Sequence, residues 1–177
     1  MTIRPVTPDD AKALLAVYAP YVTETAITFE YDAPSEEEFR ERIIGITSKF
    51  PYLMAEENGK VLGYTYANTF RTRPAYKHCV ETTIYIDKSQ RHRGIGRTLY
   101  AELEKQLKAM GILNLNASIT TTDFPDEHLT PASELFHKSL GYTKVAHFHK
   151  CGYKYGRWYD MIWMEKMIGE HRVPYNN

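Results

Sequence analysis

The sequence has little cysteine, no excess of either charge and no long apolar stretch. Its 177 residues include only Cys79 and Cys151, too few for a disulfide framework, so both are expected to be reduced thiols. Lys plus Arg and Asp plus Glu number 22 each, so the chain lacks the overall positive field that holds nucleic acid or an anionic membrane. No segment is apolar over the length of a signal peptide or a membrane span. These absences favour a cytoplasmic protein with local anion sites.

Repeats, low-complexity tracts and long flexible linkers are also missing from the sequence. The length suits one domain with a full hydrophobic core. We therefore expect a single domain over 1–177, with 165–177 as a C-terminal tail.

Capping residues mark two early helices. Segment 7–10 supplies an N-cap threonine, a first-turn proline and an acidic third position, and Pro20 is expected to end that helix. Ser35 and Glu38 form a capping box for the second helix.

The rest of the chain alternates strands and helices. A hairpin is expected over 52–70, because Asn58-Gly59 suits a tight turn. The later expected elements are strands at 80–86 and 113–119, a helix from Ile95 to a cap at Gly111, a helix at 132–140, and strands at 142–149 and 158–165. This order predicts a mixed α/β sheet covered by helices.

The turn at 91–98, "RHRGIGRT", joins the strand at 80–86 to the clearest helix. A helix N-terminus exposes unpaired N–H groups that suit a phosphate, and glycine lets the backbone approach closely. The P-loop motif and the third glycine of the dinucleotide fingerprint are both missing, which leaves Arg-x-x-Gly-x-Gly. From the turn alone, a basic surface loop and an anion site are equally good interpretations.

In this context the turn resembles the coenzyme A pyrophosphate motif of the GCN5-related N-acetyltransferases (GNAT). The segments "YAPYVTETAITFEYDAPSEEEFRERI", "FRTRPAY", "VETTIYI", "LFHKSLGY" and "GYKYGRWYDM" are similar, in order, to the phosphinothricin or methionine sulfoximine acetyltransferase branch. The resemblance implies a twisted, largely antiparallel mixed sheet of about seven strands with about four helices. It also implies acetyl-CoA as co-substrate and a homodimer.

The cofactor-binding residues implied by the resemblance lie on one strand edge and on the turn. The strand edge would pair with pantetheine as another strand would. These residues are Ile84, Tyr85, Ile86, Arg91, His92, Arg93, Gly94, Ile95, Gly96, Arg97 and Thr98. The branch also carries an Asn before its helix histidine; the longer 120–133 loop lacks it, and Thr130 or Ser133 could substitute.

Two residues are the catalytic candidates. A period of two places Glu81 on the strand face opposite Ile84, where a solvated carboxylate is the ordinary interpretation. The resemblance instead implies that Glu81 is a general base acting through water. His137 of "LFHKSLGY" matches the branch histidine, as the acid that protonates the thiolate or as a group that orients the amine or water.

The acceptor pocket is implied by "FRTRPAY" and "TFE". Arg71 and Arg73 are expected on one strand face, with Tyr76 a turn beyond, and the resemblance implies that Phe29 lines the same pocket. Exposed surface arginines are the alternative. Arginine forks bind carboxylates or phosphinates, so the pattern favours an amino-acid-like acceptor.

Two other chemistries have candidate residues in the sequence. His147, His149 and Cys151 alternate along one expected strand face, but three ligands on one extended strand splay too widely to close on a metal. His78 and Cys79 would point to opposite faces and are poorly placed as a base and a thiol nucleophile. We therefore expect no metal and a direct transfer to a small amine. A non-catalytic acyl-CoA-binding module, or an enzyme for an unrelated amine, stays the alternative.

Overall fold

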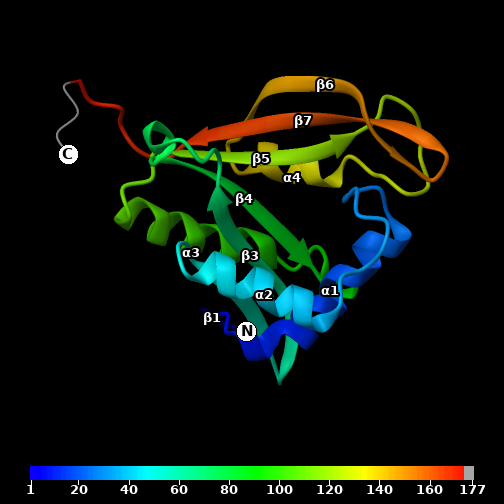
Figure 1. The fold of residues 1–177 in the computed structure, drawn as a ribbon, viewed down its shortest axis with the longest axis horizontal. Coiled ribbons are helices and arrows are strands. Elements are labelled where there is room, and N and C mark those ends of the chain that lie inside the picture. Colours follow the sequence, from blue (N-terminus) through cyan, green and yellow to red (C-terminus); the bar gives the residue numbers. More distant parts are fainter. Residues whose placement is uncertain (174–177) are drawn as a thin grey trace.

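The computed structural model describes residues 1–173 as a seven-stranded sheet with four α-helices (Figure 1). The strands are β1 (Thr2–Pro5), β2 (Tyr52–Glu57), β3 (Lys60–Thr69), β4 (Cys79–Ile86), β5 (Asn114–Thr121), β6 (Thr143–Lys154) and β7 (Arg157–Met167). The helices are α1 (Ala11–Glu24), α2 (Glu36–Thr47), α3 (Ile95–Ala109) and α4 (Ala132–Ser139), with short 3-10 helices η1 (Pro8–Asp10), η2 (Pro74–Tyr76) and η3 (Lys88–Gln90). The expected tail at 165–177 begins inside β7, and its last residues, 174–177, lie outside the described residues.

The sheet order is β1-β2-β3-β4-β5-β7-β6, and every neighbouring pair is antiparallel except β4 and β5. The parallel pair is the junction between an N-terminal half and a C-terminal half of the sheet. This architecture confirms the predicted fold class.

The β4–β5 pair separates soon after it forms. Its register covers only Cys79–Glu81 against Asn114–Asn116, whereas β4 continues to Ile86 and β5 to Thr121. The Thr82 hydroxyl donates to the Asn116 carbonyl at 3.2 Å, beside the point of divergence. The two strands therefore open a wedge within the described sheet, with Glu81 at its apex.

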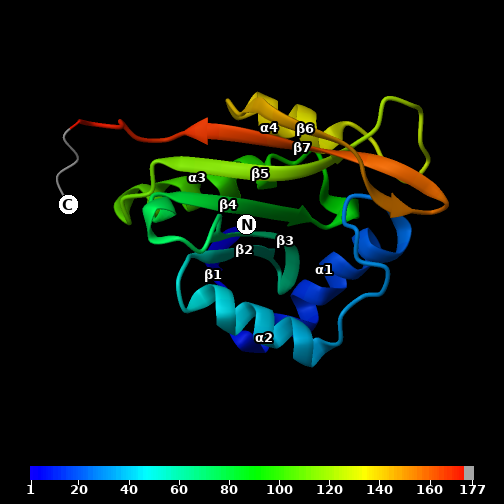
Figure 2. The ribbon, with the colours of Figure 1, turned by 45° about the horizontal axis from the view of Figure 1, so that its top comes forward.

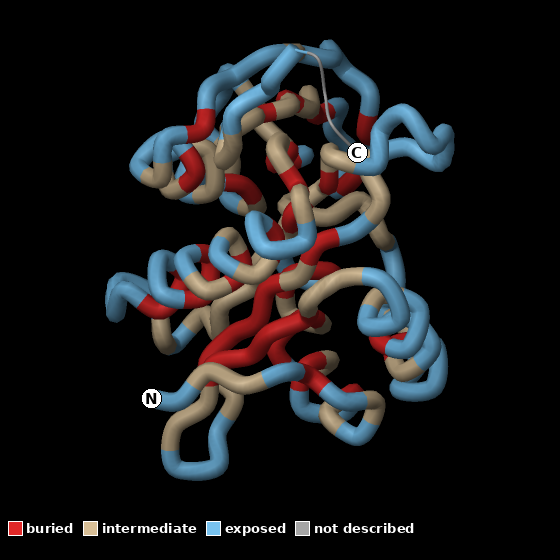
Figure 3. The backbone as a smooth tube through the Cα atoms, turned by 90° about the vertical axis from the view of Figure 1, so that its left-hand side faces the viewer, coloured by how far each residue is buried: buried red, intermediate tan, exposed pale blue. Residues whose placement is uncertain are grey.

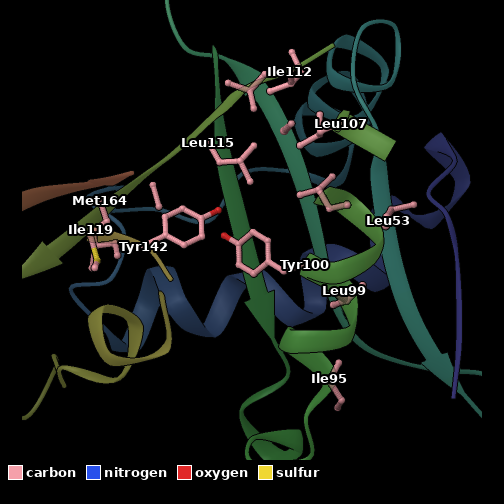
Figure 4. Packing of buried hydrophobic residues seen from close by; sticks show 14 of the residues in the cluster. Leu53, Ile95, Leu99, Tyr100, Leu107, Ile112, Leu115, Ile119, Tyr142 and Met164 are labelled. Carbon is pink, nitrogen blue, oxygen red and sulfur yellow. The ribbon is translucent and has the colours of Figure 1, made fainter. Parts of the chain in front are cut away.

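Two hydrophobic cores cover the two faces of the sheet, with α1 and α2 on one face and α3 and α4 on the other (Figure 2). Buried segments lie toward the centre of the molecule and exposed segments at its periphery (Figure 3), and β6 is exposed along most of its length. The core beneath α3 and α4 contains four α3 side chains at four-residue spacing, as the sequence predicts (Figure 4). They are Ile95, Leu99, Leu103 and Leu107.

Local capping follows the sequence closely. Both capping boxes are present, with the Thr7 amide donating to Asp10 at 2.8 Å and the Ser35 amide donating to Glu38 at 2.7 Å. At the hairpin turn, Asn58 and Gly59 both adopt positive φ, as a tight β-turn of this type requires. No helix of the described chain has the length and apolar character needed to cross a membrane.

Three local predictions were wrong. Helix α1 passes through Pro20 to Glu24, because Tyr21 and Val22 are buried and their packing outweighs the lost N–H donor. Strand β3 ends at Thr69, and the segment before Pro74 bends into η2, so Arg71 and Arg73 share no strand face.

The third correction concerns β6. The strand is irregular between Phe148 and Gly152, where Lys150 has φ of 49°. This bulge interrupts the alternation that the sequence suggested for His147, His149 and Cys151.

Candidate active site

The wedge between β4 and β5 forms a cleft of about 450 Å³. The segment after α1 covers one side of it, α4 contributes to another, and β6 and β7 each add one residue. The cleft is lined by Ile27, Thr28, Phe29, Tyr66, Glu81, Thr82, Thr83, Ile84, Tyr85, Ala117, Ser118, Ile119, Thr120, Ser133, His137, Cys151 and Met161. The structure thus brings together predicted catalytic, cofactor and acceptor residues from three parts of the chain, namely the segment after α1, β4 and α4.

Strand β4 presents different chemistry on its two faces. Val80 is fully buried beneath α3, and Ile84 packs against the same core, whereas Tyr85 packs against the core beneath α1 and α2. Glu81 shares the parity of Tyr85, as predicted. The carboxylate is therefore placed on the α1–α2 side of the wedge, away from the core that α3 covers.

Glu81 is half-buried at the apex of the cleft. Burial raises the pKa of its carboxyl, and the positive charge of Arg71 opposes this rise. A carboxylate with a raised pKa is a stronger proton acceptor near neutral pH than an exposed one. The cleft therefore places a carboxyl with a raised pKa next to solvent-accessible space.

His137 is held by two hydrogen bonds that define its protonation. Its Nδ1 lies 2.8 Å from the Ser133 carbonyl, which can only accept, so Nδ1 carries the proton. Its Nε2 lies 2.9 Å from the Tyr100 hydroxyl and accepts from it. Burial lowers the pKa of His137, which favours this neutral form. In this arrangement Nε2 has no proton to give.

The partner of His137 belongs to a buried hydroxyl network that the sequence did not indicate. Tyr100 is fully buried, and its hydroxyl, whose proton goes to the nearer His137, also lies 3.4 Å from the Thr82 hydroxyl. The Thr82 hydroxyl in turn lies 3.3 Å from that of Tyr142. Figure 4 shows the two tyrosine hydroxyls directed toward one another beside β4. Tyr100 follows Leu99 on the buried face of an amphipathic helix, so sequence periodicity identifies it only as a core residue.

The turn at 91–98 follows β4 and leads into the first turn of α3. Gly94 is the N-cap of α3 with φ of 76°, a conformation that glycine adopts without strain, and open space surrounds the position of a Cβ. Thr98 is the first residue of α3 whose amide bonds back, to Gly94 at 3.1 Å, so the preceding amides of the first turn point outward. This geometry leaves the N-terminus of α3 suited to an anion.

Gly96 has a different structural reason. A Cβ on Gly96 would lie 2.9 Å from the Phe136 ring, so glycine lets α3 pack closely against α4.

The arginines of the turn make different contacts. Arg93 pairs with Glu57 at 2.8 Å, whereas Arg91 lies over the Tyr21 ring and Arg97 contacts Ser139.

The predicted acceptor residues do not all reach the cleft. Phe29 lines it, with its ring packed over Gly152, where a Cβ would lie only 2.2 Å from that ring. Arg71 lies outside the lining, stacked on Phe70 at 4.5 Å, but its charge acts on Glu81. Arg73 and Tyr76 are exposed at η2 and are not among the lining residues of the described cleft.

The long loop before α4 is anchored to the site. Asp126 accepts from Arg157 at 2.6 Å and from the Tyr159 hydroxyl at 3.0 Å. The His128 carbonyl accepts from the Ala26 amide, just before the segment that carries Phe29. The added loop residues therefore support one wall of the cleft, with Ser133 in its lining and Thr130 outside it.

Comparison with known proteins identifies relatives of the chain. A model of the acetyltransferase (GNAT) domain matches residues 3–163. The chain is 34% identical to a phosphinothricin N-acetyltransferase of Streptomyces coelicolor, covering 94% of this chain and 95% of the relative. It is 30% identical to an L-methionine sulfoximine/L-methionine sulfone acetyltransferase of Salmonella typhimurium, covering 98% of both chains.

A solved structure shows the same fold. The GNAT superfamily phosphinothricin acetyltransferase from Sinorhizobium meliloti, in complex with AcCoA, superposes with a TM-score of 0.88 and 32% identity, over 99% of this chain and 92% of that one. Together with the matched domain, these similarities confirm the predicted resemblance. The chain belongs to the GNAT acetyltransferase family.

Proposed function

We propose that the protein transfers an acetyl group from acetyl-CoA to the amino group of a small amino-acid-like acceptor of the phosphinothricin or methionine sulfoximine type. The observation that carries this proposal is the position of Glu81, a half-buried carboxylate at the apex of the β4–β5 wedge, in one cleft with His137. The function and substrates of the relatives support the choice of reaction and acceptor.

The residues present fit coenzyme A in two places. The β4 edge from Thr82 to Ile86 has no strand partner on its β5 side in the described chain, so its backbone groups can pair with the amides of pantetheine. The α3 N-terminus, with Gly94 at φ of 76°, can hold the pyrophosphate. When bound, the thioester supplies the acetyl group, and Ser133 lies in the cleft wall to contact the cofactor.

Glu81 performs the first proton transfer in this mechanism. It removes a proton from the acceptor ammonium, through a water molecule, and the free amine attacks the thioester carbonyl. As the new C–N bond replaces the C–S bond, the nitrogen loses its second proton to water. The leaving thiolate takes up one proton, from the protonated carboxyl or from water, so the net reaction releases one proton to solvent. Burial raises the pKa of Glu81, which favours its protonated form. The carboxyl therefore accepts the proton from the ammonium more readily and holds it until the thiolate leaves.

His137 acts as a positioning residue in this proposal. Its neutral ring, fixed by Ser133 and Tyr100, sets the shape and polarity of the cleft wall without giving up a proton. These hydrogen bonds disagree with a role as proton donor, and because both ring nitrogens are engaged, any effect of His137 on the amine or water acts through the shape of the cleft wall.

An acceptor panel tests the function directly. Release of free thiol from acetyl-CoA is measured with methionine sulfoximine, phosphinothricin and methionine sulfone, and with simple alkylamines and an aminoglycoside as controls. We expect amino-acid-like acceptors to be the best substrates. Cofactor binding without thiol release for any amine would support the non-catalytic alternative, and release only with alkylamines would support an unrelated acceptor.

We also propose that the protein is a cytoplasmic homodimer built of one domain. Strand β6 is an edge of the sheet, and it exposes Val145, Phe148 and Tyr153, apolar surface that a second copy could cover. Light scattering of the purified chain measures the mass in solution; a monomer at all concentrations would contradict the dimer.

A further inference from the structure

A cluster of metal-ligand side chains lies on the outer strand pair, apart from the proposed catalytic groups. His147 and His149 of β6 and Asp160 of β7 offer ligand atoms that all lie within 4.8 Å of one another. Asp160 Oδ2 is 2.8 Å from His147 Nε2 and 3.1 Å from His149 Nδ1. The two imidazole rings have centroids 4.1 Å apart. Three potential ligand atoms therefore lie close enough together to surround one ion.

The β6 bulge creates this convergence. Phe148 pairs with Met161 and Gly152 pairs with Tyr159, so the three residues 149–151 face Asp160 alone. The Lys150 amide donates to Asp160 Oδ1 at 2.7 Å. That bond fixes the carboxylate and leaves Oδ2 directed at the two rings.

The third donor is therefore not the one that the sequence suggested. Cys151 lines the active-site cleft, and the neighbouring strand supplies Asp160 in its place. The objection to three ligands on one extended strand does not apply to two histidines on β6 and a carboxylate on β7.

We propose that His147 Nε2, His149 Nδ1 and Asp160 Oδ2 bind a divalent transition-metal ion such as Zn²⁺, Co²⁺ or Ni²⁺, with water at the open position. Two imidazoles and one carboxylate suit these ions better than Mg²⁺ or Ca²⁺. Bonds of about 2.0–2.2 Å in a tetrahedral site place neighbouring ligand atoms about 3.3–3.5 Å apart. The two distances from Asp160 Oδ2 to the imidazole nitrogens need to widen by only a few tenths of an ångström, and the two imidazole nitrogens, within 4.8 Å of each other, need to reach the same spacing.

Access and rigidity both favour binding. The His149 side chain is 72% exposed, so an ion can reach the site from solvent, whereas Asp160 is 14% exposed and held by the backbone. A bound ion would join β6 to β7 across the bulge. Because Cys151 of the bulge and Met161 beside Asp160 both line the cleft, the ion would stiffen one wall of the active site without contacting the reacting groups.

Cobalt titration of the tag-free, full-length chain tests the site. Co²⁺ in a four-coordinate site should give visible absorption bands that saturate at one ion per chain and disappear on competition with Zn²⁺. His149→Ala and Asp160→Asn should each weaken binding by at least about tenfold. His171→Ala, which changes an exposed histidine outside the cluster, is the matched control and should bind as the wild type does.

The outcomes separate the metal site from a simple hydrogen-bonded cluster. Absence of saturable bands in the wild type, or equal affinity in the wild type and His149→Ala, would overturn the proposal. Zn²⁺ should also raise the melting temperature of the wild type more than that of Asp160→Asn. Thiol release should survive treatment with a chelator, and its loss would contradict a site separate from acetyl transfer.

Discussion

The Tyr100 hydroxyl donates to His137 Nε2 at 2.9 Å, so the histidine in the cleft wall is held from below by a fully buried tyrosine. The Ser133 carbonyl accepts from Nδ1 on the other side of the ring. The pair links the core beneath α3 to the cleft, and it gives the first prediction.

Tyr100→Phe should keep the ring packing and remove the donor to His137. A buried acceptor left without its partner costs about 1–3 kcal/mol of stability. We expect kcat to fall about tenfold, equivalent to about 1.4 kcal/mol of barrier, because Nε2 is no longer fixed. Tyr142→Phe is the matched control, since its hydroxyl contacts Thr82 and not His137. Equal activity of the two variants would contradict the positioning role.

Stability should depend on pH through His137. Burial lowers the folded-state pKa of this histidine below the ordinary value of 6.5, so the unfolded chain binds the proton more readily. Its contribution is complete above about pH 6.5 and is lost as the pH falls through the lowered folded-state pKa. Urea unfolding from pH 7.5 to 5 should therefore show a steeper loss for the wild type than for His137→Gln. Parallel curves would contradict a neutral, buried imidazole.

Acetyl-CoA should stabilise the folded chain. At a hundred times its dissociation constant, the ligand should add about 2.7 kcal/mol to the free energy of unfolding, measured as a shift in melting temperature. Gly94→Val should remove most of this shift, because a branched side chain at φ of 76° both strains and blocks the α3 N-terminus. Gly59→Val is the control, since Gly59 has the same φ in a distant hairpin. If acetyl-CoA raises the melting temperature of Gly94→Val as much as that of the wild type, the cofactor does not bind at this turn.

The two candidate acceptor arginines should behave differently. Arg71 lowers the pKa of Glu81, so Arg71→Ala should move the acidic limb of the pH–rate profile to higher pH. Arg73→Ala, at an exposed position in the same segment, should leave that limb in place. Both variants are assayed with an amino acid and its decarboxylated amine. If neither variant raises KM selectively for the acid, the arginines do not bind the acceptor carboxylate.

Much of the site could be predicted because it depends on local patterns. Alternation along β4 placed Glu81 opposite Ile84, and helical spacing placed the start of α3 directly after the glycine turn. Sequence alone could not show where β4 and β5 separate, since that depends on register between strands far apart in the chain.

The wrong predictions share a tertiary cause. Helix α1 continues past Pro20 because Tyr21 and Val22 are buried. The bulge at Lys150 turns Cys151 away from the two histidines and places Asp160 beside them. Tyr100 looked like an ordinary core residue because its importance depends on a hydrogen bond to α4. Each of these features is decided by contacts that local periodicity does not contain.

The central claim is that Glu81 is the general base, and Glu81→Gln tests it most directly. Loss of the base should lower kcat by roughly 10²–10⁴ with acetyl-CoA affinity almost unchanged. The raised folded-state pKa of Glu81 means that its stability contribution is present below the unfolded value of 4.5 and is lost as the pH rises through the folded pKa. Glu81→Gln should therefore also be more stable than the wild type at pH 7.5.

The decisive measurement is the kcat of thiol release at pH 7.5, with saturating acetyl-CoA and methionine sulfoximine, for the wild type and Glu81→Gln. The account predicts a folded, cofactor-binding variant whose turnover is reduced at least a hundredfold. Wild-type turnover in that variant would contradict the account and make Glu81 an ordinary half-buried strand residue.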